Sequence, residues 1–201
     1  MKRAAVVVTT ILAAALVLPV GSAHAGTLTV RTTDAATGAA LANVLVVVAE
    51  GNSVLAVGRT SAGGAFTCSV TTAGATVIAA RDLYVTDTRP LTIGAQGEQS
   101  IAFALRKHQP EDFNRLGRIV GFVRSGTGTP IPNATLVLLR EGTPVGAAQP
   151  KNPTGVYELQ WYRPGTYSVM ATAPRHAAAR HTGQTMSAGE SLWLDITLQA
   201  N

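Results

Sequence analysis

Short segments of alternating apolar and polar residues recur from residue 27 to the end of the chain. In the first half this pattern predicts strands over residues 27–33, 43–50, 53–60, 65–71, 75–81, 83–93 and 99–106. In the second half it predicts strands over residues 118–125, 134–140, 143–149, 155–162, 166–173, 178–186 and 191–199. Glycine-bearing turns separate the segments, and about seven short strands with a turn every 8 to 12 residues or so are typical of a β-sandwich. No helix is predicted in this part of the chain.

The two halves repeat one another in the same order. The segment TGAALANVLVVV corresponds to TGTPIPNATLVLL, so Asn43 falls on Asn133, 90 positions later. GGAFTCSV then corresponds to TGVYELQW, and GEQSIAFAL corresponds to GESLWLDITL. The offset rises from 90 to about 93, as one-residue loop insertions would make it.

The repeat predicts an all-β chain with two tandem seven-stranded Greek-key β-sandwich domains, over residues 26–107 and 117–201. The segment 108–116, HQPEDFNRL, is polar and contains a proline. We interpret it as a short linker, semi-extended at the proline.

The alternation also predicts which side chains fill each core. Phe66, Cys68 and Val70 share one face of their strand, and Tyr157, Leu159 and Trp161 occupy the corresponding face in the second copy. Cys68 therefore falls on Leu159 and is predicted to be a core residue. As the only cysteine of the chain, it has no partner for an intramolecular disulfide.

The first 25 residues have the three parts of a secretory signal peptide. Lys2 and Arg3 precede an uncharged apolar run, and Ala23-His24-Ala25 places small residues at a cleavage site. We expect cleavage after Ala25, which makes the mature chain, residues 26–201, secreted or periplasmic. No later segment is long and apolar enough to span a membrane.

The charge of the mature chain is modest. Without Lys2 and Arg3, 14 basic residues face 11 acidic ones, a net charge of +3. This argues against a nucleic-acid binder. Glycine, threonine, alanine and valine are abundant, as in short strands joined by tight turns.

The motifs of the second copy resemble a known family. IVGFV from Ile119, GTPIPNATLVLL from Gly128 and TGVYELQWYRPGTY from Thr154 follow its pattern. The family is the carboxypeptidase regulatory-like domain, a transthyretin-like (prealbumin-like) seven-stranded sandwich. The first copy resembles it less, because it lacks the prolines and has TTAGAT in place of RPGTY. The resemblance implies an accessory module of exported proteins and assigns no ligand.

The sequence contains no convincing catalytic or metal-binding set. His176 and His181 form a histidine pair without a nearby acidic or cysteine partner. No G-x-S-x-G motif is present, and the C-terminal LQAN differs from the Y-R-G-S of hydroxyisourate hydrolases, which have a similar fold. We therefore predict no enzymatic activity, no metal and no cofactor.

Three aromatic residues are candidates for stacking on a sugar ring, namely Trp161, Tyr162 and Trp193. Alternation places Trp193 away from the core. For the other two the arguments conflict, because strict alternation turns Trp161 inward whereas the family pattern buries Tyr162. A tryptophan that covers the linker or the partner domain is the alternative to a ligand site.

A basic stretch is the second candidate, for contact with an anionic polymer: Arg163, Arg175, His176, Arg180 and His181. Such contact would be weak and sensitive to salt. The alternative is a solvated face that keeps an edge strand from aggregating. We predict a monomeric, non-catalytic binding module for a polysaccharide or an envelope protein. A structural spacer or assembly subunit is the alternative.

Overall fold

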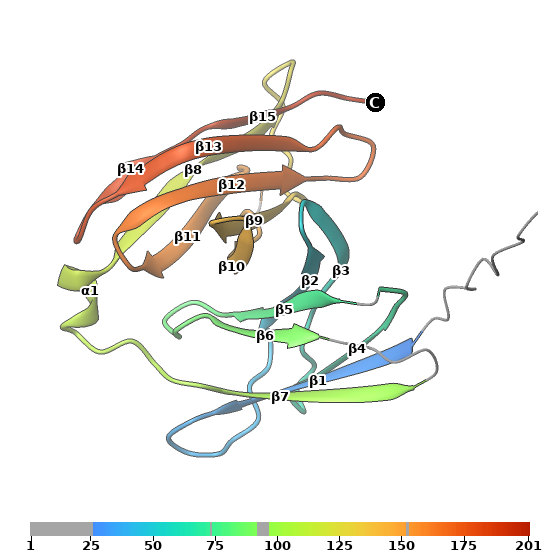
Figure 1. Cartoon of the computed structure of the whole chain (residues 1–201). Coiled ribbons are helices and arrows are strands. Elements are labelled where there is room, and N and C mark those ends of the chain that lie inside the picture. The colour runs from blue at the N-terminus through green and yellow to red at the C-terminus, as the bar shows by residue number, and fades with distance from the viewer. Residues whose placement is uncertain (1–25, 73, 92–96, 152) are drawn as a thin grey trace, which may run out of the picture.

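The computed structural model describes residues 26–72, 74–91, 97–151 and 153–201 (Figure 1). The predicted signal peptide, residues 1–25, lies outside the described residues, and so do residues 92 and 93 of one predicted strand. Within the described part of the chain, no helix has the length and apolar character needed to cross a bilayer.

The strands follow the predicted ranges closely. The first seven are β1 (Gly26–Asp34), β2 (Leu45–Glu50), β3 (Ser53–Arg59), β4 (Ala65–Val70), β5 (Ala75–Ala80), β6 (Asp87–Leu91) and β7 (Glu98–Leu105). One helical turn follows, α1 (Asp112–Arg115). The later strands are β8 (Gly117–Ser125), β9 (Thr135–Arg140), β10 (Thr143–Ala148), β11 (Val156–Tyr162), β12 (Gly165–Thr172), β13 (Ala179–Met186), β14 (Ser191–Trp193) and β15 (Ile196–Leu198).

Each group of strands forms a pair of sheets, which we call the first sandwich (β1–β7) and the second sandwich (β8–β15). The orders β4-β1-β7 and β3-β2-β5-β6 in the first correspond to β11-β8-β14 and β10-β9-β12-β13 in the second, with β15 also paired to β8. Each first strand pairs in parallel with the last. Both copies even have a β-bulge at the same place, with Leu55 and Val145 as the extra residues. The predicted all-β sandwich class is confirmed.

Each sandwich has its own core between its two sheets. Cys68 pairs across the sheet with Leu28, and Leu159 pairs in the same way with Ile119. The two residues are therefore equivalent, as the repeat predicts. Leu159 is fully buried, whereas Cys68 packs against its core while partly exposed. Burial raises the pKa of the Cys68 thiol, which favours its uncharged form.

A third apolar cluster joins the two sandwiches. Its members come from β2 and β5 of the first and from β9, β10 and β12 of the second: Leu45, Val47, Ala49, Ile78, Val137, Leu139, Ala147 and Met170. In Figure 1, β9 and β10 lie next to β2 and β5, between the two sandwiches. This explains why LVVVA and TLVLL are continuous apolar runs: one face of each strand fills its own core and the other face contacts the neighbouring sandwich.

Two predicted strands differ from the observed ones. The sixth begins at Asp87, because Leu83 adopts a left-handed φ of 69° and residues 83–85 bond instead to residues 106–108. The last predicted strand is broken into β14 and β15 around Leu194. The Leu194 carbonyl accepts a 2.7 Å hydrogen bond from the Tyr157 hydroxyl and lies against Gly121, where a Cβ atom would overlap it.

The segment between the sandwiches is more ordered than the predicted linker. Its imidazole, His108, is buried beside Phe113 of α1, with ring centroids 6.0 Å apart. The His108 Nδ1 atom lies 3.4 Å from an Asp112 carboxylate oxygen, but neither ring nitrogen has a hydrogen-bond partner among the described residues. The prediction of a semi-extended segment is therefore wrong: apolar contacts fold it into a turn that packs on the protein.

His108 makes stability depend on pH. Burial lowers the pKa of this imidazole below its ordinary 6.5, although the Asp112 carboxylate opposes the shift and Arg106 adds to it. The unfolded chain then binds a proton at His108 more readily than the folded chain does. The contribution of His108 to the free energy of unfolding is therefore complete above about pH 6.5 and is lost as pH falls towards the lower folded-state pKa.

We expect His108→Phe, which keeps an aromatic ring at this position, to flatten the dependence of unfolding free energy on pH below about pH 6.5. Urea unfolding at a series of pH values measures it, with His181→Phe on β13 as the control. An unchanged slope in His108→Phe would contradict the assignment.

Candidate functional site

The outer face of the sheet β11-β8-β14 carries an unusual set of side chains. Arg118, Val120, Phe122 and Arg124 alternate along β8 with residues of the core, so they point away from it. Their neighbours across the sheet are Glu158 and Val156 on β11 and Ser191 and Trp193 on β14. We call this surface the outer face.

Aromatic rings occupy one end of the outer face. Trp193 is 59% exposed, and its ring centroid lies 5.7 Å from that of Phe122 in an edge-to-face arrangement. The Arg124 guanidinium lies over the Phe122 ring, 4.2 Å from its centroid. The exposed position of Trp193 agrees with the alternation in the sequence.

A β-bulge resolves the conflict over Trp161 and Tyr162. Leu159 pairs with Ile119, but Tyr162 pairs with Gly117, so β11 contains one extra residue at this point. Trp161 adopts a left-handed φ of 59°, which shifts the alternation by one position. The prediction from strict alternation is therefore wrong, and Tyr162 is the buried residue.

Trp161 consequently lies beside the outer face and not in the core. Its ring centroid is 4.7 Å from that of Phe113, and the Arg118 guanidinium lies 5.4 Å from its ring. Tyr162 instead contacts the first sandwich, since its hydroxyl lies 3.3 Å from the Thr86 hydroxyl. Burial raises the pKa of Tyr162 to about 12. Of the three aromatic candidates, Trp193 lies on the outer face, Trp161 lies beside that face near Arg118, and Tyr162 lies apart from both.

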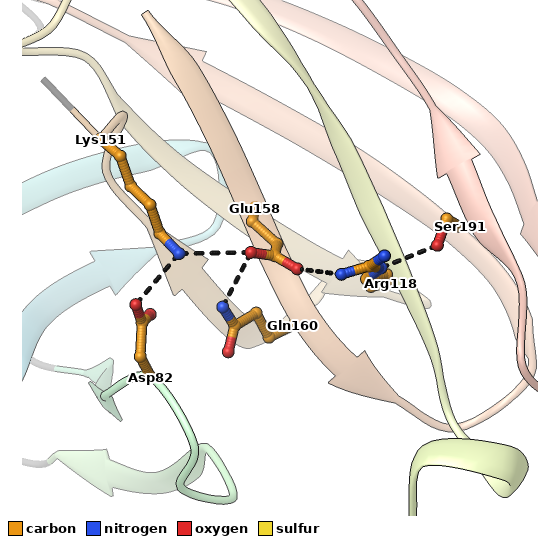
Figure 2. A network of polar contacts seen from close by, with 6 residues as sticks. All are labelled: Asp82, Arg118, Lys151, Glu158, Gln160 and Ser191. Atoms are coloured by element: carbon orange, nitrogen blue, oxygen red, sulfur yellow. Dashed lines mark hydrogen bonds and ion pairs between the residues drawn. The ribbon is translucent and has the colours of Figure 1, made fainter. Parts of the chain in front are cut away.

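A polar row crosses the same sheet (Figure 2). Glu158 lies at its centre and accepts hydrogen bonds from Arg118 at 2.7 Å, from Gln160 at 2.9 Å and from Lys151 at 3.3 Å. Arg118 also donates to the Ser191 hydroxyl at 2.7 Å. Figure 2 shows that the row runs from β14 across β8 and β11 to the edge of the sheet. At that edge Lys151 also pairs with Asp82 of the first sandwich, at 3.0 Å.

The charged groups of the row are held by one another. Burial would raise the pKa of Glu158, but its bonds to Gln160, Arg118 and Lys151 outweigh burial and lower it. Burial would likewise lower the pKa of Lys151, but Asp82 and Glu158 outweigh it and raise it. Both groups are therefore ionised at neutral pH. Among the residues that the structure describes, no group of three or more His, Cys, Asp or Glu side chains is placed to hold a metal ion.

The first sandwich shows what the fold itself requires at these positions. Thr29 pairs with Thr67 and Ser100, whereas its counterpart Val120 pairs with Glu158 and Trp193. The complete outward set on β1 is Thr27, Thr29, Arg31 and Thr33, where β8 has Arg118, Val120, Phe122 and Arg124. The same sheet therefore forms with three threonines and one arginine on this strand, and its architecture does not account for the aromatic residues and the ion-paired row of the second copy.

The basic stretch does not form one surface. Arg163 lies in the turn before β12, whereas Arg175 and His176 lie in the loop at the far end of that strand. Arg180 and His181 are neighbours on β13 and point to opposite sides: Arg180 donates to Asn52 of the first sandwich at 2.8 Å, and His181 pairs with the core residue Val169.

Sequence reasoning missed several residues of the outer face, namely Arg118, Phe122, Arg124 and Glu158. The repeat contained a signal for them, because the first copy has threonine at the positions equivalent to three of these four residues. Recognising it required the register of the strands, which the sequence comparison alone had not fixed.

Comparison with known proteins finds a family model that matches the second sandwich. Residues 118–199 match the model of the carboxypeptidase regulatory-like domain. The second sandwich is therefore similar to a carboxypeptidase regulatory-like domain. The match begins at β8 and ends just after β15, so it includes the whole outer face and excludes the first sandwich. The likeness of the first sandwich to this domain rests on its matching strand order. No curated protein matches the sequence.

Solved structures resemble the chain loosely. The Bacillus anthracis TIE protein is 17% identical with a TM-score of 0.38, over 87% of this chain and 34% of that protein, so the present chain spans about a third of its length. The minor pilin GBS52 of Streptococcus agalactiae is 10% identical with a TM-score of 0.37, over 88% of this chain and 96% of that one. A cohesin–X-dockerin complex from Acetivibrio cellulolyticus is 20% identical with a TM-score of 0.33, over 42% of this chain and 58% of that one. These values are too low to support an argument about function.

Proposed function

We propose that the chain is an exported, non-catalytic binding module that attaches to a polysaccharide of the cell envelope through its outer face. The observation that carries this proposal is the exposed Trp193, which packs on Phe122 beside the polar row of the second sandwich, with Trp161 against Arg118 of that row. The signal-peptide pattern of residues 1–25 supports export to the periplasm or the exterior. The module acts as a monomer and needs no metal or cofactor.

The chemistry of the face suits a sugar polymer. An exposed indole ring offers a flat apolar surface and a hydrogen-bond donor, and so stacks on the apolar face of a pyranose ring. The polar row lies next to Trp193, because Glu158 and Trp193 pair with Val120 from its two sides and Arg118 is two residues further along β8. Arg118 and Glu158 offer a donor and an acceptor for sugar hydroxyls. Because the row is already hydrogen-bonded internally, its side chains are held in place before a ligand arrives.

Retention on insoluble polysaccharides tests this function. We expect residues 26–201 to be retained on at least one matrix of a panel of polysaccharides and cell-wall sacculi, at low salt and in roughly 1 M NaCl, because stacking is not screened. Trp193→Ala should weaken retention by roughly tenfold. Leu83→Ala is the matched control, because Leu83 is 64% exposed but lies in the first sandwich.

Two results would count against the outer face. Retention that disappears in high salt would indicate binding through basic residues instead. Retention that Trp193→Ala and Leu83→Ala reduce equally would show a nonspecific apolar contribution.

A second candidate function is a spacer or assembly subunit of the envelope. The apolar cluster between the sandwiches favours it, because a buried interface holds two domains at a fixed orientation. Failure of every matrix to retain the protein, together with capture of a purified envelope protein, would favour this function over polysaccharide binding.

A further inference from the structure

The two sandwiches enclose a cleft beside their apolar contact. Its volume is about 580 Å³, within the range of roughly 300–1,000 Å³ that is usual for small-ligand sites, which often lie between domains. The first sandwich contributes residues 80–82, 84 and 86 and the ends of β2 and β3, and the second contributes the end of β10 and residues of β11. The cleft is therefore complete only when both sandwiches are in contact.

Two arginines of the first sandwich line this cleft without a carboxylate partner among the described residues. Arg59 donates to the Asn43 carbonyl at 3.1 Å and to the Gln149 side chain at 3.3 Å, so its guanidinium is held in place while some of its N–H groups stay free. Arg81 lies over the Tyr84 ring, with its Cζ atom 5.1 Å from the centroid.

The acidic side chains of the cleft are already paired with other cations. Asp82 pairs with Lys151 at 3.0 Å, and Glu158 pairs with both Lys151 and Arg118. The positive charge of Arg59 and Arg81 is consequently not balanced within the cleft, which favours a ligand with a negative charge.

The fold does not require either arginine. By strand register Arg59 corresponds to Gln149 in the second copy, and Arg81 corresponds to Ala173. The second sandwich therefore forms the equivalent sheet with an amide and a methyl group at these two positions. Side-chain amides also line the cleft, at Asn43, Gln149 and Gln160. Amides of this kind donate and accept hydrogen bonds with hydroxyl groups.

We propose that this cleft binds an acidic saccharide, with Arg59 and Arg81 holding the carboxylate of a uronic acid and the amides holding its hydroxyls. Guanidinium groups bind carboxylates through paired, charge-assisted hydrogen bonds, which are stronger than those between neutral groups. This site adjoins the outer face, because Glu158, Lys151 and Gln160 of the polar row also line the cleft. Its ligand contacts are assigned to the arginines of the first sandwich, so the proposal does not rest on the function proposed for the outer face.

Titration of residues 26–201 with trigalacturonic acid tests the site. Three comparisons sharpen the test: the fully methyl-esterified trimer, which lacks the charge but keeps the rings; a tripeptide with a free carboxylate; and Trp193→Ala, which leaves the cleft intact. We expect the acid to bind, the ester and the peptide to bind far more weakly, and Trp193→Ala to bind the acid normally.

Arg59→Gln and Arg81→Gln should each weaken binding of the acid by about tenfold or more. Arg31→Gln is the matched control, because Arg31 is exposed on the first sandwich outside the cleft. Arg59→Gln installs the residue that the second copy carries at this position, so the fold is expected to tolerate it. Equal binding of acid and ester, equal binding of the peptide, no binding at millimolar concentration, or an equal loss in Arg31→Gln would each overturn the proposal. Loss of binding in Trp193→Ala alone would assign the saccharide to the outer face instead.

Discussion

Replacing Val47 with aspartate is expected to separate the two sandwiches. Val47 is fully buried and lies in the apolar cluster between them, so a carboxylate at this position would be buried without a partner. We expect the contact between the two sandwiches to be weakened by about 3–5 kcal/mol, a size typical of an unpaired buried charge. Each sandwich keeps its own core, so separation lets the carboxylate reach water. Unfolding should then occur in two transitions, and the radius of gyration in small-angle X-ray scattering should increase.

Val137→Asp is the counterpart from the second sandwich, because Val137 belongs to the same cluster on the other side of the contact. It should reproduce both effects. Leu55→Asp is the matched control, since Leu55 is on β3 of the same sheet but 40% exposed. If Val47→Asp behaves like Leu55→Asp, with one transition and unchanged dimensions, the two sandwiches are not held together through this cluster.

Truncation of Leu159 is expected to give the second large effect. Leu159 is fully buried in the core of the second sandwich, and Leu159→Ala should lower the free energy of unfolding by about 2–5 kcal/mol through lost burial and a residual cavity. Cys68→Ala at the equivalent position should cost only about 1 kcal/mol, because the side chain is smaller and partly exposed.

Urea unfolding of both variants measures the difference. The dependence of free energy on urea concentration should be unchanged, because neither substitution alters the surface exposed on unfolding. A loss in Cys68→Ala as large as that in Leu159→Ala would contradict the difference in burial between the two positions.

The fold was largely predictable because the local sequence pattern indicates each strand. Alternation and glycine turns depend on neighbours in sequence, and the repeat gave two independent views of one arrangement. The continuous apolar runs at residues 45–49 and 136–139 also signalled strands buried on both faces. Such a run does not say which surface covers the second face, so the contact between the sandwiches was not predicted.

The candidate site was less predictable, because it depends on register. A single extra residue in β11 turns Trp161 out of the core and Tyr162 into it, and alternation cannot reveal a bulge. Arg118, Glu158 and Lys151 are separated by up to 40 positions in sequence and meet only across strands. The basic stretch shows the converse, since residues adjacent in sequence on β13 point to opposite sides of the sheet.

The most direct test of the outer face is a titration of ¹⁵N-labelled protein, residues 26–201, with a soluble oligosaccharide prepared from a polysaccharide that retains it. The account predicts that the largest chemical-shift changes occur at the Trp193 indole N–H and at the backbone amides of β8, β11 and β14. Shift changes confined to the first sandwich or to β13, under conditions where the oligosaccharide competes with the matrix, would contradict it.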